Sequence, residues 1–389
     1  MSHDYLGNPL STRDATTLAA IDDFIGGLLT YEPRAEGILP AADAAPDDLP
    51  VNVYAGFLAM FIESPDAAPL ASHYRARARL LLDANTPKRE STLLALLDAL
   101  IADDTPLALT LTDQLLDAHP RDLFALKLSH YLRFNKGDSP GMLRVALKVL
   151  PHASEVAQVH GMLAFAYEQC HLLADAETAA RQALELEPRE PWAQHALAHV
   201  LLTEGRISEG TAFLESVKYG WVGLNSFMYT HNWWHLALFH LARGRQQRVL
   251  DIYDQHVWGI LPEYSQDQIG AVSLLTRLEL AEVDVSARWQ ALAEYLQVRR
   301  NDTIQPFLSL QYLYGLARAG RPQAKTLLAA LQLRAEQAPE HSRAVWREIT
   351  WPAAEGLYAH ATGDFERAAQ RLDSVLPRLV EAGGSHAQR

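Results

Sequence analysis

Five short breaks of one kind separate the helix-forming segments of this chain. In each break a glycine precedes a charged residue: Gly137-Asp138, Gly205-Arg206, Gly244-Arg245, Gly320-Arg321 and Gly363-Asp364. The segments between the breaks are rich in Ala and Leu and amphipathic at helical spacing, without convincing strand-like alternation. Glycine accepts the left-handed backbone conformation that ends a helix, so we expect tight turns between consecutive helices. The pattern predicts an all-α fold.

A repeat of 34 residues supports this prediction. A shift by 34 positions pairs Leu173 with Ile207, Ala176 with Gly210, and Ala164 with Ala198. Small residues fall where paired helices approach closely, as in the tetratricopeptide repeat of two antiparallel helices. We therefore expect one continuous α-solenoid over residues 1–389, a right-handed superhelix of helix pairs with a concave groove. Residues 1–90 are expected to form an irregular helical part and 91–389 the repeats, which are clearest at 155–217.

Composition excludes several classes of function. The 389 residues include 34 Lys and Arg against 47 Asp and Glu, a formal net charge of −13. An acidic chain without a basic block argues against a nucleic-acid surface. The single cysteine, Cys170, allows no internal disulfide and no Cys-rich zinc site, and it is expected in the helical core. The start lacks the layout of a signal peptide, and the most apolar run, 93–102, is too short to cross a bilayer. These features predict a soluble, cytoplasmic protein that does not bind membranes.

Two pairs of histidines carry the densest chemistry. His195 and His199 lie four residues apart in WAQHALAHV, and His231 and His235 lie four apart in THNWWHLALFH. Residues four apart share one face of a helix. Numbering within the repeat places both pairs at positions that generally face the groove of a solenoid. We therefore expect the four imidazoles to converge on one cavity walled by Trp192 or Trp234.

Three interpretations of this cluster stay open. The imidazoles could be structural, packed beside tryptophans and hydrogen-bonded internally. They could bind zinc, iron or copper, because neutral imidazole is a common ligand for these metals. They could also recognise a small polar ligand or serve in acid/base chemistry. The zinc-protease motif lacks its glutamate, since Ala196 and Asn232 stand at that position. Glu168 and Gln169 lie near the expected groove, where they could contact a ligand or form a solvated face.

Several motifs resemble those of the tetratricopeptide repeat protein 38 family, and the chain is similar to a bacterial member of that family. They are GMLAFAYEQ, WAQHALAHVLLTEGRISEG, HNWWHLALFHLARG, IYDQHVWG, SLLTRLEL and EAGGSHAQR. The resemblance covers most of the chain and implies a single-domain α-solenoid without a defined reaction. The positions it marks as of interest are Trp192, His195, His199, His231, Trp234, His235, Asp254 and His386. The family tends to continue past the SHAQR motif, so the chain is expected to lack a final helical stretch.

The leading hypothesis is a tetratricopeptide-like scaffold that binds a small polar ligand or a peptide segment in its concave groove. The ligand-binding residues would be Glu168, Gln169, Trp192, His195, His199, His231, Trp234, His235 and His386. The alternative is an enzyme of hydrolase or lyase type, in which the four cluster histidines act by acid/base or metal-assisted chemistry. The ligand, the metal content and the existence of a homo-oligomer stay open at this point.

Overall fold

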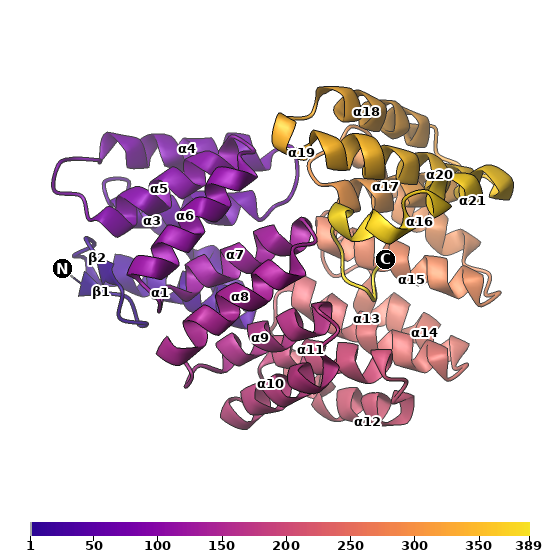
Figure 1. Cartoon of the computed structure of the whole chain (residues 1–389), viewed down its shortest axis with the longest axis horizontal. Coiled ribbons are helices and arrows are strands. Elements are labelled where there is room, and N and C mark those ends of the chain that lie inside the picture. Colours follow the sequence, from indigo (N-terminus) through magenta and orange to yellow (C-terminus); the bar gives the residue numbers. More distant parts are fainter. Residues whose placement is uncertain (1) are drawn as a thin grey trace. The chain divides into compact units, whose positions relative to one another are not determined.

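The computed structural model describes residues 2–389 and contains, over that range, 21 α-helices and one two-stranded antiparallel ribbon (Figure 1). The ribbon pairs β1 (Ser2–His3) with β2 (Pro9–Leu10). The prediction of an all-α, tetratricopeptide-like fold is confirmed. The chain forms two compact units, and two of the five divisions between them fall inside helices α7 and α11. The structure thus describes two units along a chain for which the sequence predicts one continuous solenoid.

Unit 1 comprises the chain up to Arg133, Ser139–Val200 and Gly223–Asn225. Its helices are α1 (Ala15–Thr30), α2 (Ile38–Ala44), α3 (Leu49–Met60), α4 (Ala67–Leu80), α5 (Lys88–Ile101), α6 (Thr105–Ala118), most of α7 (Leu123–Asn135), α8 (Ser139–Val149), α9 (Ala157–Gln169), α10 (Leu173–Leu186) and most of α11 (Pro191–Thr203). The prolines of residues 33–50 are typical of a loop, but this stretch contains the 3₁₀ turn η1 (Pro33–Gly37), α2 and the start of α3. Proline lies near the N-terminus of these elements, where its missing N–H is not needed.

Unit 2 comprises Phe134–Asp138, Leu201–Val222 and Ser226–Arg389. Its helices are the end of α11, α12 (Ile207–Val217), α13 (Ser226–Ala242), α14 (Gln246–Ile252), α15 (Ser265–Leu280), α16 (Ser286–Leu296), α17 (Pro306–Arg318), α18 (Gln323–Gln337), α19 (Glu340–Ala344), α20 (Trp351–Ala361) and α21 (Phe365–Asp373). Two π-helical segments extend helices of this unit, η4 (Tyr253–Val257) and η6 (Val345–Thr350). Within residues 2–389, no helix combines the length and hydrophobicity that crossing a bilayer requires.

The helix boundaries follow the 34-residue period. Helices α9 and α11 begin at Ala157 and Pro191, and α10 and α12 begin at Leu173 and Ile207. The five glycines of the breaks, Gly137, Gly205, Gly244, Gly320 and Gly363, all have positive φ, between 67° and 87°. At Gly205 the left-handed residue lets the chain reverse between α11 and α12, a conformation that costs other residues about 1–2 kcal/mol. The sequence-based prediction of tight turns at these breaks is confirmed.

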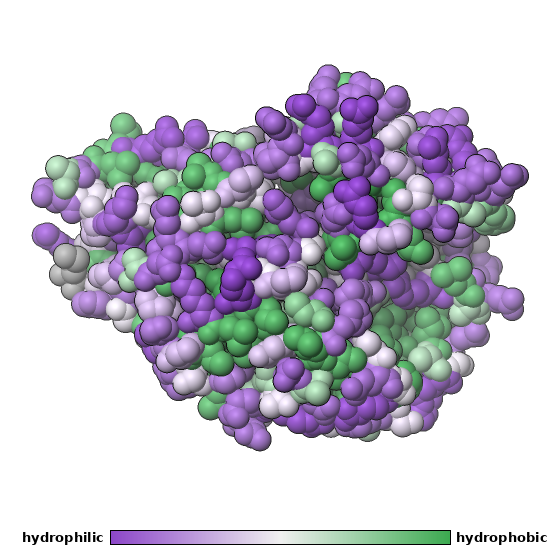
Figure 2. Space-filling model, viewed as in Figure 1, coloured by the Kyte–Doolittle hydropathy of each residue, from purple (hydrophilic) through white to green (hydrophobic). Residues whose placement is uncertain are grey.

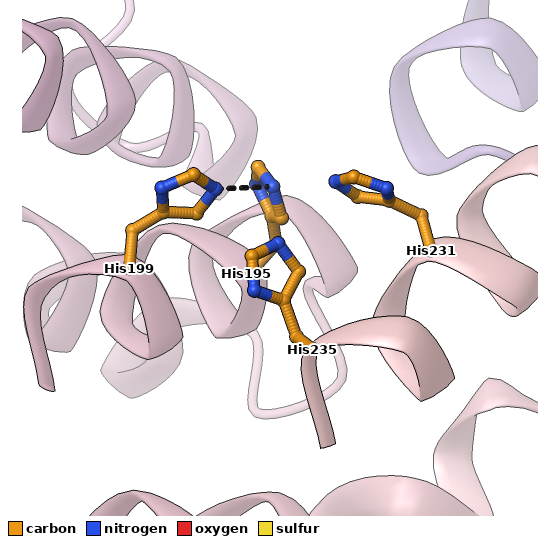
Figure 3. A group of neighbouring side chains, drawn as sticks. All are labelled: His195, His199, His231 and His235. Atoms are coloured by element: carbon orange, nitrogen blue, oxygen red, sulfur yellow. Dashed lines mark hydrogen bonds between the residues drawn. The ribbon is translucent and has the colours of Figure 1, made fainter. Parts of the chain in front are cut away.

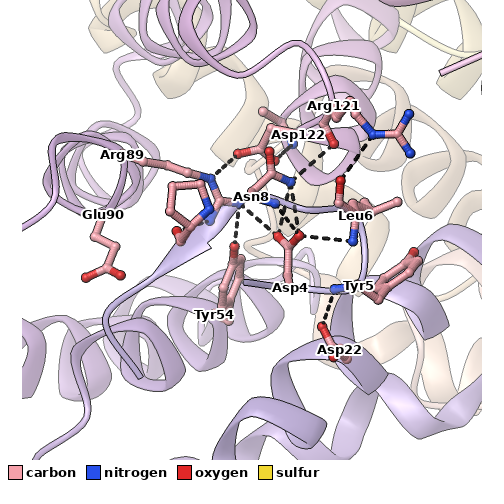
Figure 4. A network of polar contacts seen from close by, with 12 residues as sticks. Asp4, Tyr5, Leu6, Asn8, Asp22, Tyr54, Arg89, Glu90, Arg121 and Asp122 are labelled. Atoms are coloured by element: carbon pink, nitrogen blue, oxygen red, sulfur yellow. Dashed lines mark hydrogen bonds and ion pairs between the residues drawn. The ribbon is translucent and has the colours of Figure 1, made fainter. Parts of the chain in front are cut away.

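A buried ion-pair network fastens the N-terminal segment to unit 1 (Figure 4). Arg89 at the start of α5 donates from Nε to Asp122 at 2.8 Å and reaches Asp4 at 3.5 Å. It also donates to the hydroxyl of Tyr54 at 3.1 Å. Asn8 donates from its amide to Asp4 and to the carbonyl of Arg121. Because the charged groups are buried and each has several partners, the network fixes the path of residues 2–12.

Candidate functional site

The first histidine pair stands on α11 and has a carboxylate behind it. His195 and His199 are each 1 % exposed, and their Nε2 atoms lie 3.0 Å apart. Glu168, on α9, places Oε1 3.5 Å from Nδ1 of His199. An acceptor beside Nδ1 favours a proton on that nitrogen and directs the lone pair of the ring to Nε2. The result is a buried chain of carboxylate, imidazole and imidazole.

The second pair stands on α13 with aromatic side chains around it. The rings of His231 and His235 are 4.8 Å apart and nearly perpendicular. Trp234 is buried and stacks on His231 at 5.4 Å with an angle of 7° between the rings. Phe227 stacks on His231 as well, at 5.5 Å. These aromatic contacts fix the orientation of the His231 ring.

One potential ligand nitrogen from each of the four histidines lies within 4.8 Å of the corresponding atom of the other three. Figure 3 shows the rings of His195, His199, His231 and His235 directed toward one another. All four side chains are buried. Nitrogens bound to one tetrahedral zinc lie about 3.3 Å apart. The group of four histidines is present in the structure, and the groove that it was expected to line stays a prediction.

One tryptophan stacks on a histidine of each pair. Trp192 is partly buried and stacks on His195, with ring centroids 4.4 Å apart and an interplanar angle of 29°. Phe165 contacts both Trp192 and His195 from α9. Trp234 covers His231, as described above. Aromatic rings thus contact each histidine pair within its own unit.

The remaining expected residues have mixed outcomes. Glu168 and Gln169 are buried, at 0 % and 5 % exposure, so the alternative of a solvated face is wrong for them. They are buried because α10 packs against α9 and the two side chains bond to each other. His386 is exposed in the C-terminal segment, beside Arg389, and is not one of the four grouped histidines. Asp254 forms a surface ion pair with Arg288 at 2.7 Å.

Sequence reasoning missed a polar group within unit 1, near Trp192. The ring of Tyr31 stacks on Trp192 at 5.4 Å, and Nζ of Lys127 lies 3.5 Å from the centre of the Tyr31 ring. Glu190, directly before α11, is 1 % exposed. The available signal was Lys127 itself, the one cation in the apolar run LFALKLSHYL of α7. Burial lowers the pKa of Lys127 to about 7 and raises that of Glu190 to about 7.

Unit 2 holds a further buried acid that sequence reasoning missed. Asp267, near the start of α15, is fully buried and accepts a hydrogen bond from the N–H of Leu261 at 3.0 Å. The hydroxyl of Thr230 lies 3.4 Å from its other oxygen. Burial raises the pKa of Asp267 to about 6, in spite of these donors.

No family model matches the chain. Among solved structures, it is similar to a Rap protein complexed with competence and sporulation factor, with 12% identity over 96% of this chain and 99% of that chain and a TM-score of 0.48. It is similar to Cut9 in the APC/C hetero-tetramer Cut9–Hcn1, with 14% identity over 96% and 79% of the two chains and a TM-score of 0.42. Yeast Tom70 matches with 12% identity over 92% and 90% and a TM-score of 0.43. Likenesses of this degree assign no function, and the fold assignment rests on the helix pairs themselves.

Proposed function

We propose that His195, His199, His231 and His235 together bind one divalent transition-metal ion. The observation that carries the proposal is the placement of four imidazole nitrogens within 4.8 Å of one another among buried side chains. Each neutral imidazole carries one N–H donor and one nitrogen lone pair that can bind a metal ion. An ion at their centre would accept one lone pair from each ring.

The kinds of atoms in the group support zinc, iron or copper over calcium or magnesium. Imidazole suits the first-row transition metals, whereas the hard cations prefer oxygen ligands. Glu168 stands behind His199 as the carboxylates behind metal-bound histidines do, and its charge would offset part of the dication. A site closed by four protein ligands is typical of structural metal centres, while catalytic centres keep one position open.

We also propose a role for the chain as a whole. The helix pairs support a binding scaffold for a small polar ligand or a peptide segment, with the ion holding its histidines in place. Membership of the tetratricopeptide repeat protein 38 family, a cytoplasmic location and self-association belong to the same proposal as further expectations. The alternative, acid/base catalysis of hydrolase or lyase type, draws support from the Glu168–His199–His195 chain, which resembles an oriented general base.

Metal titration tests the proposal. Chelator-treated protein is titrated with Zn²⁺, Fe²⁺ and Cu²⁺ in turn against a chromophoric competitor, while the midpoint of thermal unfolding is recorded. We expect one equivalent to bind and to raise the midpoint, because an ion that binds only the folded chain adds about 2.7 kcal/mol at a hundredfold excess over its dissociation constant. His199→Ala and His235→Ala should each weaken binding and reduce this gain, because one of the four ligands is lost. His341→Ala is the matched control, since that exposed histidine lies on α19.

Binding that persists unchanged in both cluster variants would refute the metal site, as would the absence of stoichiometric binding of any of the three ions. The alternative is tested separately by nitrogen NMR of the imidazoles in the metal-free protein. If Glu168 orients His199 for acid/base chemistry, Glu168→Gln should change the tautomer of His199 and leave that of His341 unchanged. An unaltered His199 signal would count against the alternative.

A further inference from the structure

The Tyr31–Trp192 stack forms an aromatic wall beside a lysine. Tyr31 closes the C-terminal end of α1, and its carbonyl accepts a hydrogen bond from the N–H of Asn225 at 2.6 Å. Lys127 places its ammonium 3.5 Å from the Tyr31 ring centre and 5.8 Å from that of Trp192. Among residues 2–389, Lys127 forms no ion pair and no side-chain hydrogen bond, and its ammonium lies over aromatic faces.

Glu190 supplies the opposite charge in the same part of unit 1. One carboxylate oxygen, Oε2, accepts the N–H of Ala193 and so caps α11. The other oxygen, Oε1, is buried and has no hydrogen-bond partner within the described chain. Space for the carboxylate comes from Gly161 on α9, where a Cβ atom would lie 2.8 Å from Oε2.

The two charges act on each other without pairing. The field of Lys127 favours the carboxylate form of Glu190, and that of Glu190 favours the ammonium form of Lys127, yet no nitrogen of Lys127 lies within 4.0 Å of an oxygen of Glu190. Burying two opposite charges without pairing them costs folding free energy, because no contact between them compensates for the lost hydration of either group. A group that accepts from the ammonium and donates to the carboxylate would satisfy both.

We propose that Lys127 and Glu190 bind the head of a small organic acid that carries a hydrogen-bond donor next to its carboxylate, an α-amino acid or an α-hydroxy acid. The carboxylate of the ligand would pair with Lys127, and its amino or hydroxyl group would donate to Oε1 of Glu190. The stacked rings of Tyr31 and Trp192 would cover the apolar part of the ligand. This site is independent of the proposed metal ion.

The titration behaviour of the two side chains agrees with this assignment. Burial lowers the pKa of Lys127 to about 7 and raises the pKa of Glu190 to about 7, so both charges are held poorly near neutral pH. A ligand that brings a charge or donor to each residue would restore both charged forms. Buried groups with perturbed pKa values of this kind cluster at binding sites.

Four matched probes of similar size test the proposal on the full chain by titration calorimetry. L-Alanine carries both carboxylate and amine, L-lactate both carboxylate and hydroxyl, propionate the carboxylate alone, and isopropylamine the amine alone. A panel of the other L-amino acids extends the first arm to larger side chains. We expect binding from the amino-acid arm or the lactate arm, at least tenfold tighter than propionate and isopropylamine. The stronger of the two arms identifies the class of ligand.

Variants link binding to the two residues. Lys127→Met and Glu190→Gln should each weaken binding of the best probe at least tenfold. Lys136→Met is the matched control and should bind as the unchanged protein does, because Lys136 is exposed directly after α7. If either site variant fails to fold, protection against acetylation in the unchanged protein replaces it: the bound probe should slow acetylation of Lys127 and not of Lys136, as read by mass spectrometry.

Three results would overturn the proposal. One is the absence of binding by every probe at millimolar concentration, which would mean that water alone bridges the two charges. The second is binding that Lys127→Met leaves unchanged. The third is a bound probe that fails to protect Lys127. None of these results depends on whether the histidines bind a metal, so failure here and failure of the proposed function are distinguishable.

Discussion

At the scale of single residues, burial decides the chemistry of this chain. Glu168, Glu190 and Asp267 are acidic residues with side chains almost completely withdrawn from water. Each has a different counterpart: an imidazole for Glu168, a helix N-terminus for Glu190, and an N–H with a nearby hydroxyl for Asp267. The sequence shows that an acidic residue lies on a helix, but it does not show which acidic side chains are buried. Burial depends on which helices pack over each side chain.

The raised pKa of Asp267 gives a testable dependence of stability on pH. The folded chain holds the proton up to about pH 6, whereas the unfolded chain releases it near pH 3.8. The folded state therefore binds more protons between these values, and stability contributed by this group is lost as the pH rises through that window. Relative to Asp267→Asn, the unchanged protein should lose up to about 3 kcal/mol between pH 4 and pH 7.

Thermal unfolding of the two proteins across this range provides the measurement. Asp373→Asn is the control, because Asp373 is exposed on α21. As the pH rises, the unfolding midpoint of the unchanged protein should fall relative to that of Asp267→Asn. Its difference from the midpoint of Asp373→Asn should stay constant. Parallel curves for all three proteins would contradict a raised pKa at Asp267.

At the scale of elements, small residues set the distance between paired helices. Ala176, Ala180 and Ala183 are all fully buried on α10, which packs against α9. One repeat later, the position of Ala176 is taken by Gly210 on α12, where a Cβ atom would collide with the ring of Phe239. The same position in two successive repeats therefore requires the smallest side chains.

Replacing Ala176 with Phe should overpack the contact between α9 and α10. We expect a loss of about 1–3 kcal/mol, measured as a lower midpoint of thermal unfolding, because the core has no room for the added ring. Ala174→Phe is the matched control, since Ala174 is exposed on the same helix. Equal midpoints for the two variants would show that the position of Ala176 is not a close contact.

Replacing a glycine with alanine should change the stability of the protein in opposite directions in α12 and in α15. Gly210→Ala should destabilise the protein, since the new methyl group meets the ring of Phe239. Gly270→Ala, in α15, should stabilise it by about 0.5–1 kcal/mol, because no heavy atom lies within 4 Å of the new methyl group and alanine favours the helix. Thermal unfolding of both variants tests this, and changes of the same sign would contradict it.

The helix pairs and their period could be predicted from the sequence because glycine, alanine and helical spacing carry local signals. The turn between α9 and α10 lacks such a signal: His171 occupies the left-handed position there, with a φ of 57°. The helices within 33–50 were missed because their prolines read as loop residues until the starts of the helices are known. The four-residue spacing of each histidine pair is visible in the sequence. Lys127 and its aromatic partners, in contrast, come from three separate elements, α7, the end of α1 and α11, and leave no local pattern.

At the scale of the whole molecule, most of the formal net charge of −13 comes from residues 1–50 and 151–200. On the face that Figure 2 shows, hydrophilic side chains gather over α18, and hydrophobic ones appear in smaller areas among polar residues elsewhere. Binding specificity is therefore expected from particular buried groups instead of from a broad charged surface. Those groups are the four histidines and, in unit 1, the Lys127 and Glu190 pair.

X-ray absorption at the metal edge of protein loaded with one equivalent of Zn²⁺ tests the central claim most directly, because it reports the atoms bound to the ion. We expect four nitrogen neighbours at about 2.0–2.1 Å with the multiple scattering of imidazole rings. We also expect fewer imidazole neighbours in His199→Ala and an unchanged spectrum in His341→Ala. A shell dominated by oxygen, or a spectrum that His199→Ala leaves unaltered, would contradict a four-histidine metal site.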